Sequence, residues 1–414
     1  MTSDPILQDL VDICGVRFAR RAGSADAVAG APASWIAAPA TIDGAAAVLR
    51  LAAAHELAVV ARGAGTKLDW GARPTKADLM IELSRLAGIW HHPLEESFVE
   101  IGAGTPVRAA QAMLRRVGQR LALDPPSAGA SIGGMVAVDE AGPLAHRHGT
   151  VGDQLVGVSY LGPDGRLEHA AGSGTGRLLC GSVGALGVLV AATLRVQAEP
   201  AARAWVSRSV WTPLEVHDLV EVIVADPVPT AALEVDLPAS RPTAVPQRRG
   251  RGTLAVLLEG SRDAVAERAG RVATLLGGDA QVRAGAPTWW GRYPFGPGDI
   301  AVRITVPTAD LHAAVYALRD AAGQAVPVRG SAGVGVVHAA LPGDLPPERM
   351  TAILDAVRGV LLARAGSCAV VVAPPAVREA VDLWGTMATP DVVRRIKARF
   401  DPDGRLAPGR FFGV

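Results

Sequence analysis

The stretch 59–67, VVARGAGTK, constrains the fold of this chain more than any other part of its sequence. Its two valines predict the end of a buried strand, and the glycines that follow predict a tight loop. Gly63 and Gly65 allow positive φ angles and a close approach of the backbone to a ligand. Successive free N–H groups in such a loop form a concavity that binds a diphosphate, whose charge Arg62 or Lys67 would offset. Taken alone, this pattern is equally compatible with an ordinary glycine turn.

The size and composition of the chain narrow the class of protein. With 414 residues, it is long enough for two or more domains. Hydrophobic residues make up 49% and charged residues 20%, as is typical of a packed globular protein. The net charge of +1 gives no broad basic surface, so no nucleic-acid partner is expected.

The cysteines and the apolar runs indicate a cytoplasmic protein. Cys14, Cys180 and Cys368 are far apart and form no C-x-x-C pair, so no metal or iron–sulfur site is expected within the chain. Three scattered thiols suit a reducing compartment. The acidic N-terminus does not resemble a signal peptide, and the apolar run 185–194 is shorter than a membrane span. We therefore expect no direct membrane insertion, and any membrane association would come through a partner.

Hydrophobic periodicity predicts a mixed α+β fold with parallel and antiparallel strand pairs. After the pair Glu199-Pro200, strands and helices alternate, which predicts a second, smaller α/β domain. In the first two hundred residues, the predicted helices are 3–20, 42–55 and 106–117, and the predicted strands are 35–37, 58–61, 79–83, 98–102, 155–161 and 186–196.

Two further glycine clusters follow the first one along the chain. The segment 125–137 reads PPSAGASIGGMVA, and the segment 181–188 reads GSVGALGV. The paired glycines Gly133 and Gly134 have no side chains to keep a flat ligand from the backbone, and Ser131 offers a hydroxyl donor. The order of the three clusters favours a cofactor site over three unrelated turns.

With the C-terminal segment 397–411, KARFDPDGRLAPGRF, the three clusters resemble the FAD-binding fold shared by vanillyl-alcohol oxidase and p-cresol methylhydroxylase. The ending is similar to the K-x-x-F-D-P and P-G-R-F motifs of the glycolate oxidase branch. Segments 289–295, 373–374 and 384–385 resemble, more loosely, the E subunit of bacterial glycolate oxidase. The resemblance extends over nearly the whole chain, from Trp35 to Phe411, and is most specific in the flavin half.

The resemblance implies non-covalent FAD, since no histidine lies in the loop 62–71 to form a histidyl–flavin bond. It also implies a set of cofactor contacts in the three clusters. The first cluster would hold the pyrophosphate, the second would follow the ribityl and diphosphate stretch, and the third would lie near the adenine end or the ring. The implied residues are Arg62, Gly63, Ala64, Gly65, Thr66, Pro125, Ser131, Ile132, Gly133, Gly134, Ala137, Leu186, Gly187 and Val188.

The resemblance also implies the domain organisation. Residues 1–200 would form an FAD-binding domain of the p-cresol methylhydroxylase type, in two subdomains of about 30–90 and 91–200. Residues 201–375 would form an α/β cap that binds the substrate. Residues 376–414 would return to the FAD domain.

The implied function is FAD-dependent oxidation of a small 2-hydroxy acid by the E-type subunit of a glycolate oxidase complex. Such a subunit works with a second flavoprotein subunit and an iron–sulfur subunit. Two alternatives stay open, namely a free-standing FAD-linked alcohol or hydroxy-acid oxidase and a non-catalytic structural subunit with weak flavin binding. The last is favoured by the segment 172–179, GSGTGRLL, which stands where relatives carry K-N-x-x-G-Y-D.

One histidine is a candidate catalytic residue. Catalytic relatives that oxidise 2-hydroxy acids carry a G-H-x-G-D-G-N-x-H motif, whereas this chain has GVGVVH over 333–338 and no metal-ligand set. His338 is the candidate base that would take the hydroxyl proton of the substrate. His146 and His148 flank Arg147 close to the second glycine cluster, and we interpret them as surface histidines.

Overall fold

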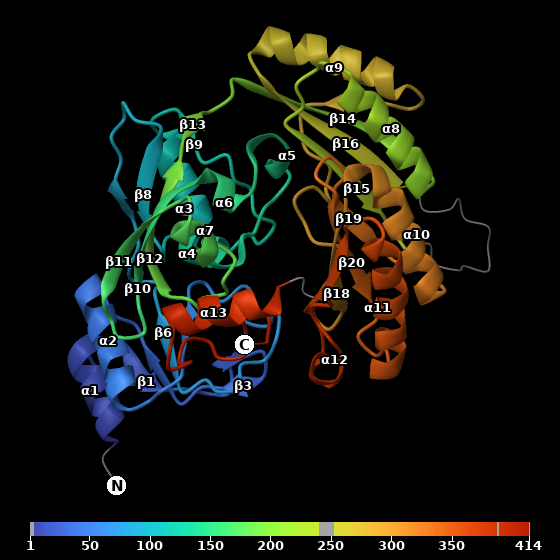
Figure 1. Ribbon diagram of the computed structural model, residues 1–414. Coiled ribbons are helices and arrows are strands. Elements are labelled where there is room, and N and C mark those ends of the chain that lie inside the picture. Colours follow the sequence, from blue (N-terminus) through green and yellow to red (C-terminus); the bar gives the residue numbers. More distant parts are fainter. Residues whose placement is uncertain (1–3, 240–251, 387–388, 414) are drawn as a thin grey trace. The chain divides into compact units, whose positions relative to one another are not determined.

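The computed structural model describes residues 4–239, 252–386 and 389–413, which form two compact units (Figure 1). The first unit contains the described residues of 4–140, 150–199 and 389–413. The second contains 141–149 and the described residues of 200–386. Among the described residues, no helix is long and apolar enough to cross a membrane.

The first sheet of the first unit carries the glycine loop at the end of an edge strand. Its order is β1-β4-β6-β5, with β4, β6 and β5 parallel and β1 antiparallel to β4. The bounds are β1 (Ala19–Arg21), β4 (Trp35–Ala37), β5 (Val59–Arg62) and β6 (Leu79–Glu82), with helices α1 (Pro5–Cys14) and α2 (Ile42–Ala54). The helix predicted over 3–20 is too long, because Gly15 ends α1 with a φ of 92° and β1 follows.

The second sheet of this unit is antiparallel, in the order β11-β10-β12-β8-β7. Its strands are β7 (Ile89–His91), β8 (Phe98–Gly102), β10 (Leu155–Leu161), β11 (Leu167–Ala171) and β12 (Val188–Arg195). Helices α3 (Val107–Arg115), α4 (Ile132–Val138), α6 (Val151–Gln154) and α7 (Thr175–Leu179) accompany it. The unit also contains two separate short ribbons, β2 (Ala27–Val28)–β3 (Ala31–Pro32) and β9 (Gln119–Arg120)–β13 (Gln197–Ala198). Together the two sheets confirm the α+β class with parallel and antiparallel pairs.

The C-terminal helix α13 (Pro390–Phe400) and the tail after it belong to the first unit. Lys397 is buried, and its Nζ donates to Asp401 Oδ2 at 2.6 Å and to the carbonyls of Ala185 and Leu406 at 2.9 and 2.7 Å. Leu406 also forms a parallel bridge with Val59, directly before the glycine loop. The lysine and aspartate of K-x-x-F-D-P therefore fasten the tail to this unit.

The second unit is an eight-stranded antiparallel sheet with helices packed on one face. Its order is β17-β14-β16-β15-β19-β20-β18-β21. The strands are β14 (Ala202–Val210), β15 (Ala232–Leu237), β16 (Gly252–Gly260), β17 (Gln281–Arg283), β18 (Ile300–Thr305), β19 (Val328–Ser331), β20 (Val336–Leu341) and β21 (Ser367–Val372).

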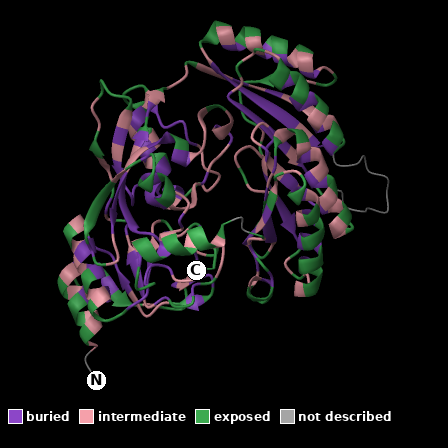
Figure 2. Cartoon of the chain, in the orientation of Figure 1, coloured by how far each residue is buried: buried purple, intermediate pink, exposed green. Residues whose placement is uncertain are grey.

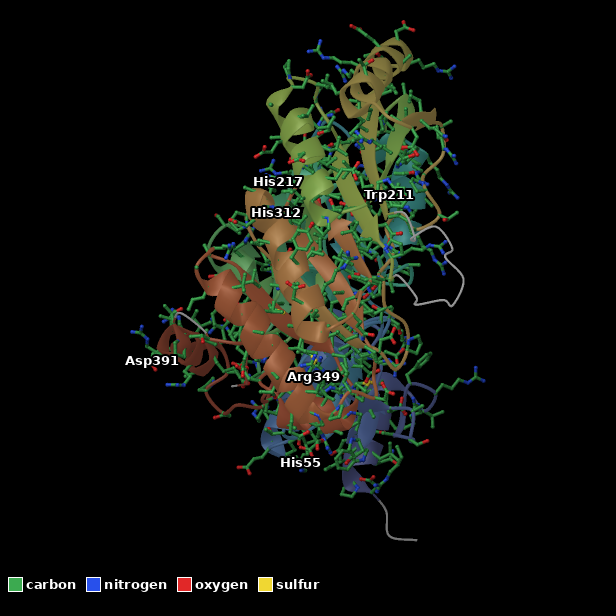
Figure 3. The ribbon with its side chains drawn as sticks, turned by 90° about the vertical axis from the view of Figure 1, so that its right-hand side faces the viewer. His55, Trp211, His217, His312, Arg349 and Asp391 are labelled. Atoms are coloured by element: carbon green, nitrogen blue, oxygen red, sulfur yellow. The ribbon has the colours of Figure 1, made fainter. Side chains whose placement is uncertain are left out.

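Four long helices cover one face of this sheet, namely α8 (Pro213–Ala225), α9 (Arg262–Leu276), α10 (Leu311–Ala322) and α11 (Pro347–Leu362). Figure 2 shows the strands largely buried and the outer sides of these helices exposed. Figure 3 shows His217 of α8 beside His312 of α10, with ring centroids 4.5 Å apart. The remaining short helices are α5 (Ala145–His148), η1 (Thr308–Asp310) and α12 (Pro375–Ala380).

Candidate functional site

The first glycine cluster forms a tight loop directly after β5. Gly65 has a φ of +75°, a conformation that favours glycine. A Cβ atom on Gly63 would collide with Ser131 Oγ, which belongs to the second glycine cluster. The two clusters, far apart in sequence, therefore meet at a point where only a glycine fits.

The second cluster is docked on the turn after β8 by its own backbone. Ile132 N–H donates to the carbonyl of Thr105 at 2.8 Å, and Gly133 N–H donates to that of Ala103 at 2.8 Å. Ser131 caps α4, since its Oγ accepts a hydrogen bond from Gly134 N–H at 3.2 Å. These contacts fix the residues of α4 that face the first loop.

The third cluster contributes a strained residue. Val183 has a φ of 57°, which is rare for a β-branched side chain, and its N–H donates to the carbonyl of Ala137 at 2.7 Å. Strained backbone of this kind is concentrated at functional sites. Here it brings the third cluster against α4.

Residues of the three clusters line an open cleft within the first unit. Seven of the predicted cofactor residues line it, namely Gly63, Ala64, Gly65, Thr66, Ser131, Gly134 and Ala137. Seven further residues complete the lining, namely Val60, Ala61, Lys67, Leu68, Val138, Val183 and Arg410.

For other predicted cofactor residues, contacts within the protein explain why that residue type is present. The Arg62 guanidinium bonds Asp26 Oδ1 at 3.2 Å. Ile132 and Val188 lie in the hydrophobic cores. A Cβ on Gly133 would come within 2.7 Å of Ala103 Cβ, and one on Gly187 within 2.6 Å of the Tyr160 ring. Along with Pro125 and Leu186, these residues are not among those that line the cleft.

A buried ion pair lies at the lining of the cleft. Lys67 Nζ is 2.6 Å from Glu140 Oε1, with side chains 7% and 2% exposed. Lys67 also contacts Ser127 Oγ and lies 4.2 Å from the centroid of the Trp70 ring. Burial lowers the pKa of Lys67, and the Glu140 carboxylate opposes that change. The pair places a buried ammonium group and its carboxylate partner beside the glycine loop.

A second cation reaches the cleft from the C-terminal tail. Arg410 is buried, and its guanidinium donates to the carbonyls of Leu68 and Trp70 at 2.9 and 2.7 Å. Sequence reasoning identified the P-G-R-F motif but gave Arg410 no role. The available signal was the arginine of the P-G-R-F motif itself, at residue 410.

These residues fit a dinucleotide cofactor. The cleft offers backbone free of side chains at Gly63 and Gly134, a hydroxyl at Thr66, and two basic side chains, Arg410 and the Glu140-paired Lys67. Glycine loops and basic side chains together are what a diphosphate requires.

The histidines singled out from the sequence lie in the second unit. His338 is on β20, and its ring centroid is 4.8 Å from that of Tyr293. His146 is on α5, where its Nε2 bonds Thr230 Oγ1 at 2.9 Å and burial lowers its pKa. Both His146 and His148, interpreted from the sequence as surface histidines, are half-buried.

One part of the chain matches a known protein family. Residues 33–171 match the family described as the FAD binding domain. This range includes the first two glycine clusters and ends before the third.

Several named proteins are similar to this part of the chain. D-2-hydroxyglutarate dehydrogenase of Xanthomonas citri is 31% identical over 178 residues, 40% of this chain and 37% of that protein. Mitochondrial D-lactate dehydrogenase [cytochrome] of Arabidopsis thaliana is 30% identical over 37% of this chain and 28% of that protein. Glycolate oxidase subunit GlcE of Escherichia coli is 32% identical over 35% of this chain and 43% of that protein. The matches thus span less than half of each relative.

Solved structures share the fold of the chain. Alkyldihydroxyacetonephosphate synthase matches with a TM-score of 0.73 and 15% identity, over 98% of this chain and 85% of that one. Chitooligosaccharide oxidase matches with a TM-score of 0.68 and 15% identity, over 99% of this chain and 98% of that one. These likenesses confirm the predicted p-cresol methylhydroxylase type of fold.

Proposed function

Because this chain carries an FAD-binding domain over residues 33–171, we propose that it is an FAD-dependent oxidoreductase acting on the CH–OH group of a 2-hydroxy acid. The observation that carries the proposal is the cleft in which three glycine clusters meet beside Lys67 and Arg410. Bound FAD would supply the acceptor for two electrons and a hydrogen. The chain itself would hold the diphosphate and orient the cofactor.

The substrate class rests on the named relatives. Their names refer to D-2-hydroxyglutarate, D-lactate and glycolate, all of which are 2-hydroxy acids. The matches cover the FAD-binding part of the chain, and the second unit would select among such acids. A substrate screen should therefore begin with glycolate and both enantiomers of lactate.

In its more specific form, the proposal is an E-type subunit of a glycolate oxidase complex. Its support is the similarity to the Escherichia coli subunit and the K-x-x-F-D-P ending, which holds the tail on the FAD-binding unit. The proposed partners are a second flavoprotein subunit and an iron–sulfur subunit that would relay electrons. The proposed location is the cytoplasm, with membrane association only through these partners.

A structural subunit with weak flavin binding is the second candidate. One observation favours it, since the segment 172–179 lacks the lysine, tyrosine and aspartate of the K-N-x-x-G-Y-D stretch. In the structure this segment follows β11 and contains α7, and its Arg177 pairs with Asp153 at 2.7 Å. A free-standing oxidase would instead be recognised by turnover of a hydroxy acid by the isolated chain.

We retain His338 as the proposed base for the substrate hydroxyl. A general base typically contributes a factor of about 10² to 10⁴ to the rate. His338→Gln should therefore lower kcat by about that factor and remove the acidic limb of the pH–rate profile. A change in KM alone would contradict this role.

The experiment that tests the function is the visible spectrum of the purified full-length chain, followed by heat or acid denaturation. A flavin spectrum with FAD in the supernatant supports the proposal, and anaerobic bleaching by glycolate or lactate supports the reaction. A colourless protein that cannot be reconstituted with FAD favours the structural subunit. Flavin that stays with the precipitate contradicts non-covalent binding.

A matched pair of variants assigns the flavin to the cleft. Gly134→Ala adds a methyl group to a residue of α4 that lines the cleft. Gly359→Ala adds the same group on α11, where no atom lies within 4 Å of the new Cβ. FAD affinity should fall for Gly134→Ala and stay unchanged for Gly359→Ala.

A further inference from the structure

The sheet of the second unit has one apolar and one polar face. Residues directly opposite one another in antiparallel strands place their side chains on the same face. One such row faces the helices and includes the buried residues Leu254, Val235, Val337, Ile304 and Cys368. A second row of directly opposite residues lies on the other face and includes Ser209, Thr253, Asp236, Arg329, His338 and Arg303. We call the latter face the polar face.

Two arginines lie beside His338 in this row, and the charge of one of them, Arg329, is balanced by a neighbouring carboxylate. Its Nε donates to Asp236 Oδ1 at 2.8 Å, and its Nη1 donates to the carbonyl of Tyr293 at 3.1 Å. Its guanidinium also lies 5.9 Å from the centroid of the Trp289 ring. Arg329 is therefore a fixed part of the sheet surface, with its charge balanced by Asp236.

Arg303 lies on the other side of His338, on β18, and is exposed. Among the described residues, no carboxylate forms an ion pair with Arg303, and its other cross-strand neighbour is Ala369. The exposed guanidinium-bearing Arg303 lies directly opposite His338, so the Cβ atoms of the two residues are about 5 Å apart. This is an unbalanced positive charge in a defined position on the polar face.

An aromatic wall borders the same position. The Tyr293 and Phe295 rings stack with centroids 4.8 Å apart, and the Tyr293 ring meets the His338 ring edge-on at 4.8 Å. The segment that carries them is held on the polar face, because Trp290 packs edge-on against Trp205 of β14 at 6.2 Å. Charged donors beside an apolar wall suit a ligand that has one anionic group and a hydrocarbon part.

We propose that Arg303 forms a carboxylate-binding site on the polar face of the second unit, beside His338. Arg303 binds the carboxylate oxygens, and Tyr293 and Phe295 pack against the carbon skeleton of the ligand. Guanidinium is suited to this task because its fork of N–H groups matches the two oxygens of a carboxylate. The site is inferred from the second unit alone and does not depend on the proposed reaction.

The test is isothermal titration calorimetry of the full-length, FAD-loaded chain with benzoate, which has no hydroxyl group to oxidise. Benzamide, its neutral counterpart, is the control ligand. Arg303→Met removes the charge, Arg303→Lys keeps it without the fork, and Arg262→Met removes an exposed arginine from α9 on the other side of the sheet. Thermal unfolding of each variant checks that the fold is intact.

The expected result is that benzoate binds and benzamide does not. Arg303→Met should weaken benzoate binding by about 10- to 100-fold, Arg303→Lys should do so by less, and Arg262→Met should have no effect. Three results would each overturn the site, namely no benzoate binding to the unmodified chain, equal binding of benzamide, or unchanged binding by Arg303→Met.

Steady-state assays then separate the two sources of a carboxylate. If Arg303→Met raises KM for a 2-hydroxy acid and benzoate competes with it, the carboxylate is that of the substrate. If turnover is indifferent to both, the site binds a separate effector. If the chain oxidises no hydroxy acid but benzoate binding still requires Arg303, the carboxylate site stands while the proposed function fails.

Discussion

The glycine-lined cleft of the first unit and the polar face of the second unit present polar groups by different means. In the cleft, glycines remove side chains so that backbone and two buried cations surround an open space. On the polar face, side chains from successive strands are aligned by the register of the sheet. The first arrangement depends on local backbone conformation, and the second depends on long-range strand pairing.

The difference explains why one region is visible in the sequence and the other is not. A loop such as 62–67 concentrates its glycines within a few residues, whereas the row on the polar face collects single residues from separate strands. It also predicts different responses to substitution. Buried groups of the cleft should affect folding strongly, while residues of the polar face should affect binding more than folding.

The largest effect is expected at the buried pair Lys67–Glu140. Lys67→Met leaves the carboxylate of Glu140 buried without its ion-pair partner, which should lower the free energy of unfolding by about 3–5 kcal/mol. Urea denaturation measures the change. The double variant Lys67→Met/Glu140→Leu should recover most of it, because both charges are then removed. Equal losses in the single and double variants would show that the pair itself is not the cause.

Two neighbouring glycines of α4 should separate packing from cofactor binding. A methyl group on Gly133 meets Ala103, so Gly133→Ala should cost about 1–3 kcal/mol through overpacking. Gly134→Ala brings its new Cβ within 3.1 Å of only one atom, Ser131 Oγ, so it should cost less stability than Gly133→Ala, yet it should weaken FAD binding. Unfolding curves and FAD titration test both. The contrast would fail if the two variants lost stability equally.

Acid should weaken the first unit through Asp26, which anchors Arg62. Hydrogen bonds from the Arg20 guanidinium hold the pKa of this buried carboxyl well below its usual 3.8 and outweigh burial, which acts to raise it. Because the folded-state pKa is the lower one, this stabilisation is present above pH 3.8 and is lost as the pH falls below it. Asp26→Asn should lower stability at neutral pH by on the order of 1–3 kcal/mol and flatten the acid-induced loss. A titration of the variant as steep as that of the unmodified protein would exclude this cause.

The smallest effect on folding is expected on the polar face. Asp236→Asn removes the carboxylate that balances Arg329, at a cost of about 0.5–1.5 kcal/mol in the free energy of unfolding. With a second uncompensated guanidinium beside His338, benzoate affinity should rise several-fold in calorimetry. A fall in affinity would indicate that Arg329 must be held in place for the carboxylate site to form.

Several features of the first unit were predictable from sequence because they are local. The glycine loop, the Ser131-Ile132-Gly133-Gly134 segment and the K-x-x-F-D-P ending are short patterns of residue types with restricted conformations. Their order along the chain sufficed to predict an FAD-binding fold. The mixed α+β class followed from hydrophobic periodicity over individual strands and helices.

The functions of individual residues within these patterns were less predictable. Gly133 and Gly134 are adjacent and identical in type, but Gly133 packs on Ala103 while Gly134 lines the cleft. Arg62 and Lys67 are both cations of the same loop, yet only Lys67 is among the residues that line the cleft. Which side of a backbone faces a ligand depends on what packs against its other side.

The sequence by itself thus indicated where the backbone turns, which segments form strands or helices, and which family of folds accommodates them. Only the tertiary structure decided that Arg410 contacts the carbonyls of Leu68 and Trp70, that Glu140 neutralises Lys67, and that Arg303 lies opposite His338. The physical reason is the distance along the chain over which each effect acts. Conformational preference acts over a few residues, whereas the partner of a charge and the face of a side chain are fixed by packing between segments far apart in the chain.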